Sequence, residues 1–145
     1  MEPSINYLAV FLGGIASMLV GFIWYSGAVF GKKWARLMGY TDQSLKEAQK
    51  EMGMLYGVSF VLAILTTYIL AHVVDLSLYF YGNPPIQTGL TSAFFMWLGF
   101  IMPVQVTGEI FGAKRWKVFQ INTGYQLASL LAAGFIMGLF AQGIG

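Results

Sequence analysis

The eight Lys and Arg residues of this chain fall in two short stretches, and long apolar runs separate these stretches. Five of the eight lie between Lys32 and Lys50, and three lie between Lys114 and Lys117. The flanking apolar segments are each about long enough to cross the ~30 Å hydrocarbon core of a bilayer at ~1.5 Å per residue. The pattern therefore predicts four transmembrane helices, over residues 6–30, 53–74, 87–110 and 118–142.

The composition is too apolar for a soluble domain. Apolar residues make up 57% of the 145 residues, and charged residues make up only 10%. A soluble domain usually carries about 25% charged residues, so most of this surface is not expected to face water. The length suits one domain. We therefore expect a single transmembrane domain over residues 1–145, folded as an all-α integral membrane four-helix bundle of two helical hairpins.

The basic stretches also predict the orientation of the helices. Loops that carry Lys and Arg stay in the cytoplasm, and here these loops are residues 31–52 and 111–117. With four spans, both termini then lie on the extracytoplasmic side, together with an outer loop over residues 75–86. The first apolar run lacks the basic region of a secretory signal, so we interpret it as a retained helix. The expected location is the cell (inner or plasma) membrane.

Short signals mark where helices should end, begin and bend. Gly39 is a helix stop after the first basic residues, and Thr41 or Asp42 is expected to cap a short helix over residues 43–51. Pro103 lies inside the third apolar segment, where its ring would collide with a carbonyl group one turn earlier. We therefore expect a kink at that point.

Two blocks of sequence recur in the second half of the chain. Residues 18–23 (MLVGFI) resemble residues 96–101 (MWLGFI), and residues 30–34 (FGKKW) resemble residues 111–116 (FGAKRW). A duplication would make the two halves parallel copies of one hairpin, related by an axis along the membrane normal. Chance similarity between short apolar segments is the alternative.

Small residues recur along two of the expected helices. Residues 13–21 carry glycine or serine near four-residue spacing, and Gly134 and Gly138 form a GxxxG pattern. Such faces let another helix approach closely. They predict packing within the bundle and, in addition, association into a homo-oligomer. The other expected partner is the lipid bilayer, and the net charge of +2 is too small to suggest nucleic acid.

Most polar side chains of the second hairpin lie in its cytoplasmic half. Gln105 and Glu109 share one helix face at i, i+4 spacing, and Asn122 and Gln126 share another after a short turn. The two pairs therefore lie at similar depth, where the first hairpin places aromatic side chains. The candidate residues for a cytoplasm-facing pocket are Trp24, Tyr25, Gln105, Glu109, Asn122, Tyr125 and Gln126.

These polar residues have two interpretations. Polar groups inside a membrane are costly, and they often mark a binding site or a permeation path. They also act as interhelical glue, at roughly 0.6 kcal/mol per hydrogen bond, and Glu109 would then pair with Lys114 or Arg115 at the interface. The sequence leaves both interpretations open.

The sequence offers few residues of the kinds that catalysis requires. The chain has no cysteine, and His72 is its single histidine. One histidine makes neither a zinc site nor a di-iron site, and no nucleophile or phosphate-loop motif is present. We therefore expect a protein that is not an enzyme, with no catalytic residues, no metal ligands and no cofactor.

Several motifs carry a resemblance to a known family. They are residues 21–26 (GFIWYS), 30–34 (FGKKW), 37–39 (LMG) and 119–125 (FQINTGY). Together they resemble the "domain of unknown function 1761" family, and the similarity extends from about residue 5 to residue 140. The resemblance implies a small bacterial or archaeal multi-pass membrane protein. It supplies no substrate.

Two functional hypotheses follow. The first is a component for transport of a small solute or an ion, with the seven candidate residues lining a cytoplasm-facing pocket. The second is a non-catalytic membrane module that binds lipid or another membrane protein. Neither hypothesis identifies the solute or the partner.

Overall fold

The computed structural model describes residues 4–141, and all regular structure in this range is helical. The α-helices are α1 (Tyr7–Trp24), α2 (Gly31–Leu37), α3 (Asp42–Ala48), α4 (Met52–Tyr81), α5 (Pro85–Met96), α6 (Met102–Phe111) and α7 (Trp116–Ala141). A 3₁₀ turn (Gln49–Glu51) joins α3 to α4, and a π-helical turn (Trp97–Ile101) joins α5 to α6.

Four helical segments within residues 4–141 are long and apolar enough to cross a membrane. Their bounds are Tyr7–Trp24, Asp42–Tyr81, Pro85–Phe111 and Trp116–Ala141. Only 17% to 33% of the residues in their apolar windows are buried inside the molecule. Most of the apolar surface therefore points outward, as hydrocarbon allows and water disfavours. The all-α fold and the four apolar helices predicted from the sequence are confirmed.

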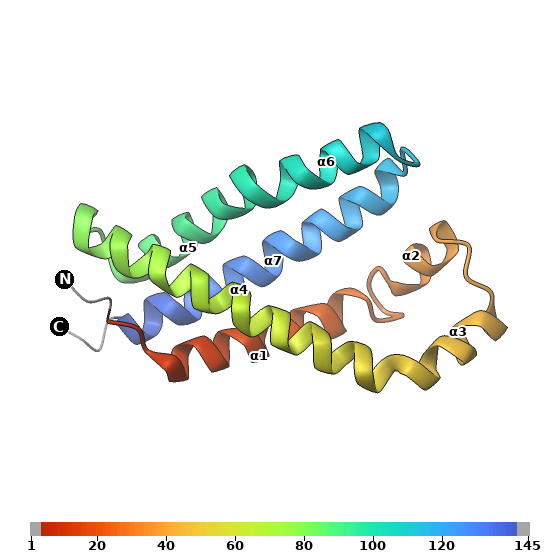
Figure 1. Cartoon of the computed structure of the whole chain (residues 1–145), viewed down its shortest axis with the longest axis horizontal. Helices are drawn as coiled ribbons and strands as arrows, with labels where there is room; N and C mark the ends of the chain where they lie inside the picture. Colours follow the sequence, from red (N-terminus) through yellow and green to blue (C-terminus); the bar gives the residue numbers. More distant parts are fainter. Residues whose placement is uncertain (1–3, 142–145) are drawn as a thin grey trace.

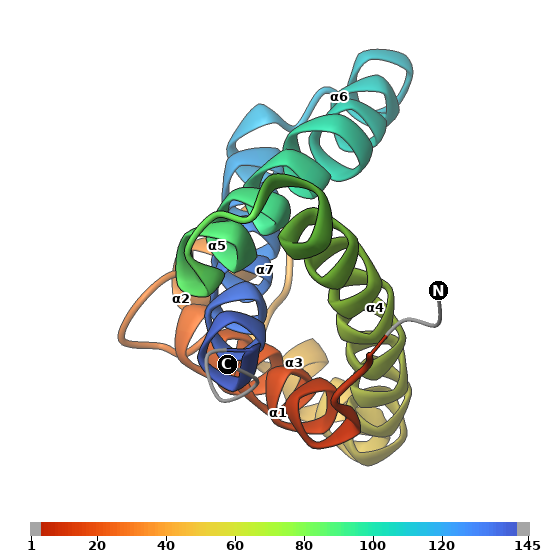
Figure 2. The same ribbon diagram turned by 90° about the vertical axis from the view of Figure 1, so that its left-hand side faces the viewer.

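Helix α7 is the central element of the bundle. It contacts α1, α4, α5 and α6, and α4 crosses it obliquely in Figure 1. Figure 2 shows α7 between α1 on one side and the α5–α6 segment on the other. Helix α1 begins at the end of the bundle where α7 finishes, and α2, α3 and the α6–α7 turn lie at the opposite end (Figure 1). We call the end where α1 begins and α7 finishes the terminal end, and the end that holds α2, α3 and the α6–α7 turn the basic end.

The buried apolar core lies in the half of the molecule nearer the terminal end. It contains Ala9 and Val10 of α1, Leu70 of α4, Ala93 of α5 and Met137 of α7, each no more than 5% exposed. At the basic end the helices diverge, and the described residues of α4 from 53 to 59 are exposed on every face. The helices of the basic half are therefore held together by contacts other than a buried apolar core.

The predicted stop and cap signals are confirmed. Gly39 follows α2 with φ +79°, a left-handed conformation that glycine adopts without strain. Thr41 caps α3, because its hydroxyl accepts from the backbone N–H of Ser44 while the Ser44 hydroxyl accepts from the N–H of Thr41. The helix therefore begins at Asp42, one residue before its predicted start.

The first apolar helix is shorter than predicted. It ends at Trp24, and residues 25–30 form a tight turn instead of a last helical segment. The turn closes through its own backbone: Phe30 N–H donates to the Trp24 carbonyl at 3.0 Å, and Gly31 N–H donates to the Ser26 carbonyl at 2.9 Å. A Cβ atom on Gly31 would collide with the Tyr25 carbonyl oxygen, so the turn requires glycine there.

The prediction of an outer loop over residues 75–86 is wrong. Helix α4 continues to Tyr81, because no glycine or proline lies between Gly57 and Gly82. Gly82 ends the helix with φ +63°, and α5 already begins at Pro85. The connection is therefore only three residues long.

Where the sequence predicts a kink near Pro103, the structure has a π-helical turn. This turn, Trp97–Ile101, comes directly before the first turn of α6, which contains Pro103. A wider turn at this point moves the carbonyl groups that would otherwise meet the proline ring. One extra residue also rotates the face of the following helix by about 100°. Helix α6 consequently presents different side chains to α7 than an unbroken helix would.

Glycines bring α5 and α7 into backbone contact. A Cβ atom on Gly89 would collide with the Gly134 carbonyl oxygen, and one on Gly134 would collide with the Gly89 carbonyl oxygen. One on Gly138 would lie 2.5 Å from Ile86 Cα. The GxxxG pattern of α7 is thus used within the chain.

The small-residue face of α1 is also used internally. Gly13 lies against Thr67 and Met137, Gly14 lies against Ile64, and Ser17 hydrogen-bonds the Ser129 carbonyl oxygen at 3.4 Å. These faces therefore give no support to the homo-oligomer, which stays a prediction.

The duplication of residues 18–23 as residues 96–101 also stays a prediction. The first copy lies in a regular helix, whereas most of the second forms the π-helical turn.

The close approach of α5 and α7 predicts unequal effects of two Gly→Ala substitutions. We expect Gly89→Ala to lower the unfolding free energy by about 1–3 kcal/mol, because the added methyl group overpacks the contact with α7. Gly57→Ala is the control, since a Cβ there meets nothing within 4 Å. It should leave stability unchanged or raise it by up to about 1 kcal/mol. Thermal unfolding in detergent measures both, and equal effects would contradict the packing.

Candidate functional site

Four of the seven predicted site residues meet at the basic end, between the end of α1 and the first half of α7. The Tyr25 hydroxyl donates to Asn122 Oδ1 at 2.7 Å, and the ring of Tyr25 lies edge-on to that of Tyr125 at a centroid distance of 5.3 Å. Trp24 Nε1–H donates to the Ile121 carbonyl at 3.0 Å. We call Trp24, Tyr25, Asn122 and Tyr125 the aromatic cluster.

Glycines on both helices make room for these rings. A Cβ atom on Gly21 would lie 3.2 Å from the ring of Tyr125, and one on Gly124 would lie 2.9 Å from the ring of Trp24. The motifs at residues 21–26 and 119–125 are thus two sides of one contact. Their glycine, aromatic and amide positions are required for packing across the α1–α7 interface.

Helix α2 extends the aromatic cluster toward the basic end. The ring of Trp34 lies 5.7 Å from that of Tyr25 and is stacked on that of Tyr40 at 5.6 Å. Trp34 Nε1 is buried and has no hydrogen-bond partner among the described residues. Sequence reasoning missed this pair, although the FGKKW motif carries Trp34.

The other three predicted residues do not join the aromatic cluster. Glu109 Oε2 accepts the backbone N–H of Arg115 at 2.7 Å, so this carboxylate closes the α6–α7 turn. The Gln105 side-chain oxygen is buried on α6 without a partner among the described residues. Gln126 lies partly buried one turn beyond Asn122. The π-helical turn explains the separation of Gln105 and Glu109, because it rotates α6 away from the face that a regular helix would present.

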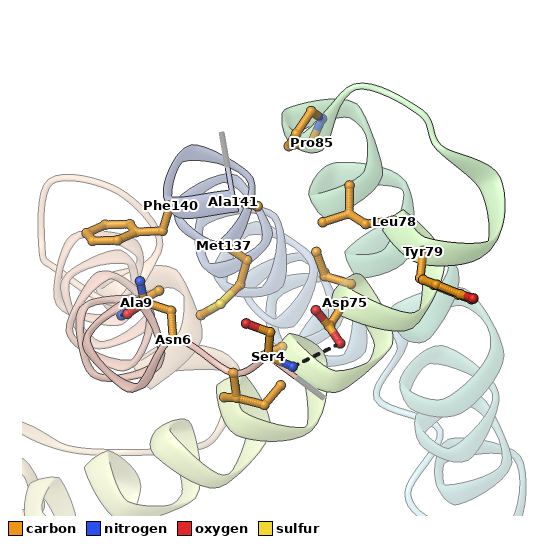
Figure 3. A pocket seen from close by; sticks show the side chains of 13 residues that line it. Ser4, Asn6, Ala9, Asp75, Leu78, Tyr79, Pro85, Met137, Phe140 and Ala141 are labelled. Carbon is orange, nitrogen blue, oxygen red and sulfur yellow. Dashed lines mark hydrogen bonds between the residues drawn. The ribbon is translucent and has the colours of Figure 1, made fainter. Parts of the chain in front are cut away.

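A cavity of about 640 Å³ opens at the terminal end, between α1, α4 and α7. Figure 3 shows Asp75 of α4 and Ser4 side by side in the lining of this cavity, with Met137 of α7 nearby. Ser4 N–H donates to Asp75 Oδ2 at 3.4 Å, and Asn6 uses its side-chain oxygen to cap α1. The remaining wall is mainly apolar and includes Ala9, Ala71, Val74, Leu78, Met137 and Phe140.

Sequence reasoning did not find this cavity. Its walls come from the first turn of α1, the last third of α4 and the end of α7, which only the fold brings together. One signal was available: Asp75 is an acidic residue in a continuous apolar helix. The expected outer loop obscured that signal, because a loop aspartate faces water at no cost.

No three His, Cys, Asp or Glu side chains within the described range 4–141 lie close enough together to hold a metal ion. His72 points its Nδ1 at the Tyr68 carbonyl, at 2.9 Å, and its ring packs against that of Tyr68. Among the residues that line the cavity at the terminal end, Asp75 carries the carboxylate.

The fold defines an all-α bundle with four helices of membrane-spanning length and apolarity. Comparison with protein-family models matches residues 8–138 to DUF1761, described as a protein of unknown function. The chain belongs to this family, and the resemblance of its motifs is confirmed. Neither the curated proteins nor the solved structures include a significant match to the chain.

The Tyr25–Asn122 hydrogen bond predicts a measurable coupling between two substitutions. We expect Tyr25→Phe and Asn122→Ala to be non-additive by roughly 0.6 kcal/mol of unfolding free energy, because each removes the same interhelical bond. The matched control pairs Tyr25→Phe with Gln126→Ala and should be additive. Reversible unfolding in mixed detergent provides the four free energies of each cycle. Additivity in the first cycle would show that the bond contributes nothing.

Proposed function

We propose that the protein is a solute-binding component of membrane transport, and that its solute is a small amphipathic cation. The observation that carries this proposal is the carboxylate of Asp75 in the lining of a mainly apolar cavity. The chain would span the inner or plasma membrane with its basic loops in the cytoplasm and this cavity on the outer side.

The charge of Asp75 has no obvious partner within the described chain. All eight Lys and Arg residues belong to the stretches at the basic end, and His72 turns its Nδ1 to Tyr68. The neighbouring donor, Ser4 N–H, lies 3.4 Å away, which is long for a hydrogen bond. An anionic group beside apolar walls is costly unless a cation or strong donor meets it. A bound ammonium or similar head group supplies that charge.

The cavity suits the rest of such a solute. Its volume of about 640 Å³ falls within the range typical of small-molecule sites. Val74, Leu78 and Met137 present apolar surface, and Tyr79 and Phe140 add aromatic rings. Aromatic faces attract cations in addition to burying apolar area. The preferred solute therefore combines an apolar body with a positive head.

The aromatic cluster would then close the opposite end of the path. Its hydrogen bonds tie α1 to α7 at the basic end while the cavity is open at the terminal end. Passage of the solute would require this seal to loosen, as alternating access demands. This role replaces the cytoplasm-facing pocket in the proposal and assigns no catalysis to the protein.

A substitution that removes the negative charge of Asp75 tests the proposal. We expect Asp75→Asn to weaken binding of tetraphenylphosphonium, a lipophilic cation, at least tenfold in isothermal titration of the purified protein, and to abolish its uptake into proteoliposomes. Asp42→Asn, an exposed acid at the basic end, is the matched control and should change neither quantity. If the unmodified protein fails to bind the cation, or if both variants bind it equally, the proposed site is wrong.

A further inference from the structure

A second cavity, of about 450 Å³, lies between α4 and α5 near the terminal end. We call it the α4–α5 groove. One wall comes from the last turns of α4 and the other from α5. Asn83, in the turn that connects these helices, also lines the groove. It contains none of the residues that line the cavity beside Asp75. The inference that follows is therefore independent of the proposed transport function.

The polarity of the groove changes along its length. Near the connecting turn its wall presents Ser77, Tyr81, Asn83, Gln87 and Thr91. About one turn deeper it presents only apolar side chains, which are Val73, Phe95, Met96 and Phe100. At 1.5 Å per residue, the polar part of α5 from Gln87 to Thr91 covers about 6 Å. That length is close to the head-group layer of one leaflet.

The polar part of the groove combines buried hydroxyl groups with exposed amides. Thr88 is 3% exposed and Ser92 is 7% exposed, and the Thr88 hydroxyl already donates to the Pro84 carbonyl at 3.2 Å. Asn83 and Gln87 are exposed, and acyl chains alone cannot satisfy their amides, which remain costly in a membrane unless they are hydrogen-bonded. An occupant of this groove therefore needs hydrogen-bonding groups at one end and an apolar chain at the other.

The lining also restricts the charge of the occupant. No Asp, Glu, Lys, Arg or His residue contributes to it, so a phosphate group finds no cation there. The side-chain amides of Asn83 and Gln87 and the hydroxyls of Ser77 and Tyr81 can each both donate and accept hydrogen bonds. That mixture matches the hydroxyl groups of a sugar or of glycerol, and aromatic rings flank it at Tyr81 and Phe95.

We propose that the α4–α5 groove binds a membrane lipid with an uncharged, hydroxyl-rich head group, such as a glycosylated diacylglycerol. The head group occupies the polar part beside Gln87 and Thr91, and one acyl chain follows Val73 and Phe95 toward the membrane centre. With the basic end in the cytoplasm, this lipid belongs to the outer leaflet.

Native mass spectrometry of the full-length protein in a polyoxyethylene detergent tests the site. The probes are monoglucosyl diacylglycerol and phosphatidylglycerol with identical acyl chains. We expect the protein to retain the glucolipid preferentially, and Thr91→Val to lower its retained fraction about fivefold, which corresponds to roughly 1 kcal/mol. The same variant should keep the unfolding temperature of the unmodified protein.

Thr66→Val is the matched control. Thr66 is an exposed threonine of α4 outside the groove, and its hydroxyl donates to the Leu62 carbonyl at 2.9 Å, as that of Thr91 donates to the Gln87 carbonyl at 2.8 Å. It should leave glucolipid retention unchanged. Equal retention of the two lipids, or equal loss in both variants, overturns the proposal. Displacement of the lipid by soluble maltose alone does so as well, because the site would then recognise a free sugar.

Discussion

The backbone contact between α5 and α7 is the constraint on which the rest of the structure depends. Inside a bilayer, helices gain little from burying apolar side chains, because lipid tails are equally apolar. Close approach must therefore come from residues without bulk, and here Gly89 meets Gly134 directly. Gly13 and Gly14 bring α1 against α4 and α7 in the same way. These contacts make α7 the axis of the bundle.

Tight packing around α7 gives the two ends different properties. Near the terminal end the small residues form a dense core, and the helices separate only at its margin to leave the cavity beside Asp75 and the α4–α5 groove. At the basic end glycines pack against large rings instead of against the backbone of another helix, and the Tyr25–Asn122 bond joins α1 to α7. The π-helical turn before Pro103 sets α6 apart from this arrangement.

The sequence was sufficient for the features that local chemistry decides. Four apolar segments, the stop at Gly39 and the cap at Thr41 follow from length, charge and side-chain type. Residues 25–30 were misjudged because the same apolar composition suits a helix and a tight turn. The turn depends on backbone space at Gly31, which composition does not record. The end of α4 was misjudged because the loop was placed from Asp75 onward, whereas the helix continues to Tyr81.

The candidate site was predictable only in part, for a related reason. Trp24, Tyr25, Asn122 and Tyr125 lie at one depth, at the end of α1 and in the first half of α7, so the order and length of the apolar segments were enough to bring them together. Gln105 and Glu109 follow the π-helical turn, and spacing counted through a regular helix no longer places them correctly. The cavity could not be predicted, since residues as distant in sequence as Ser4 and Met137 line it.

Disulfide trapping between α1 and α7 tests the central position of α7 most directly. The chain has no cysteine, so Gly13→Cys with Ala133→Cys introduces the only two thiols. A Cβ atom at residue 13 lies 3.6 Å from that of Ala133, within the range of a disulfide. After oxidation in membranes and tryptic cleavage at the Lys and Arg residues of the two basic stretches, we expect the fragment that carries residue 13 to stay linked to the fragment of the same chain that carries residue 133. Free thiols, or links only between two chains, would contradict it.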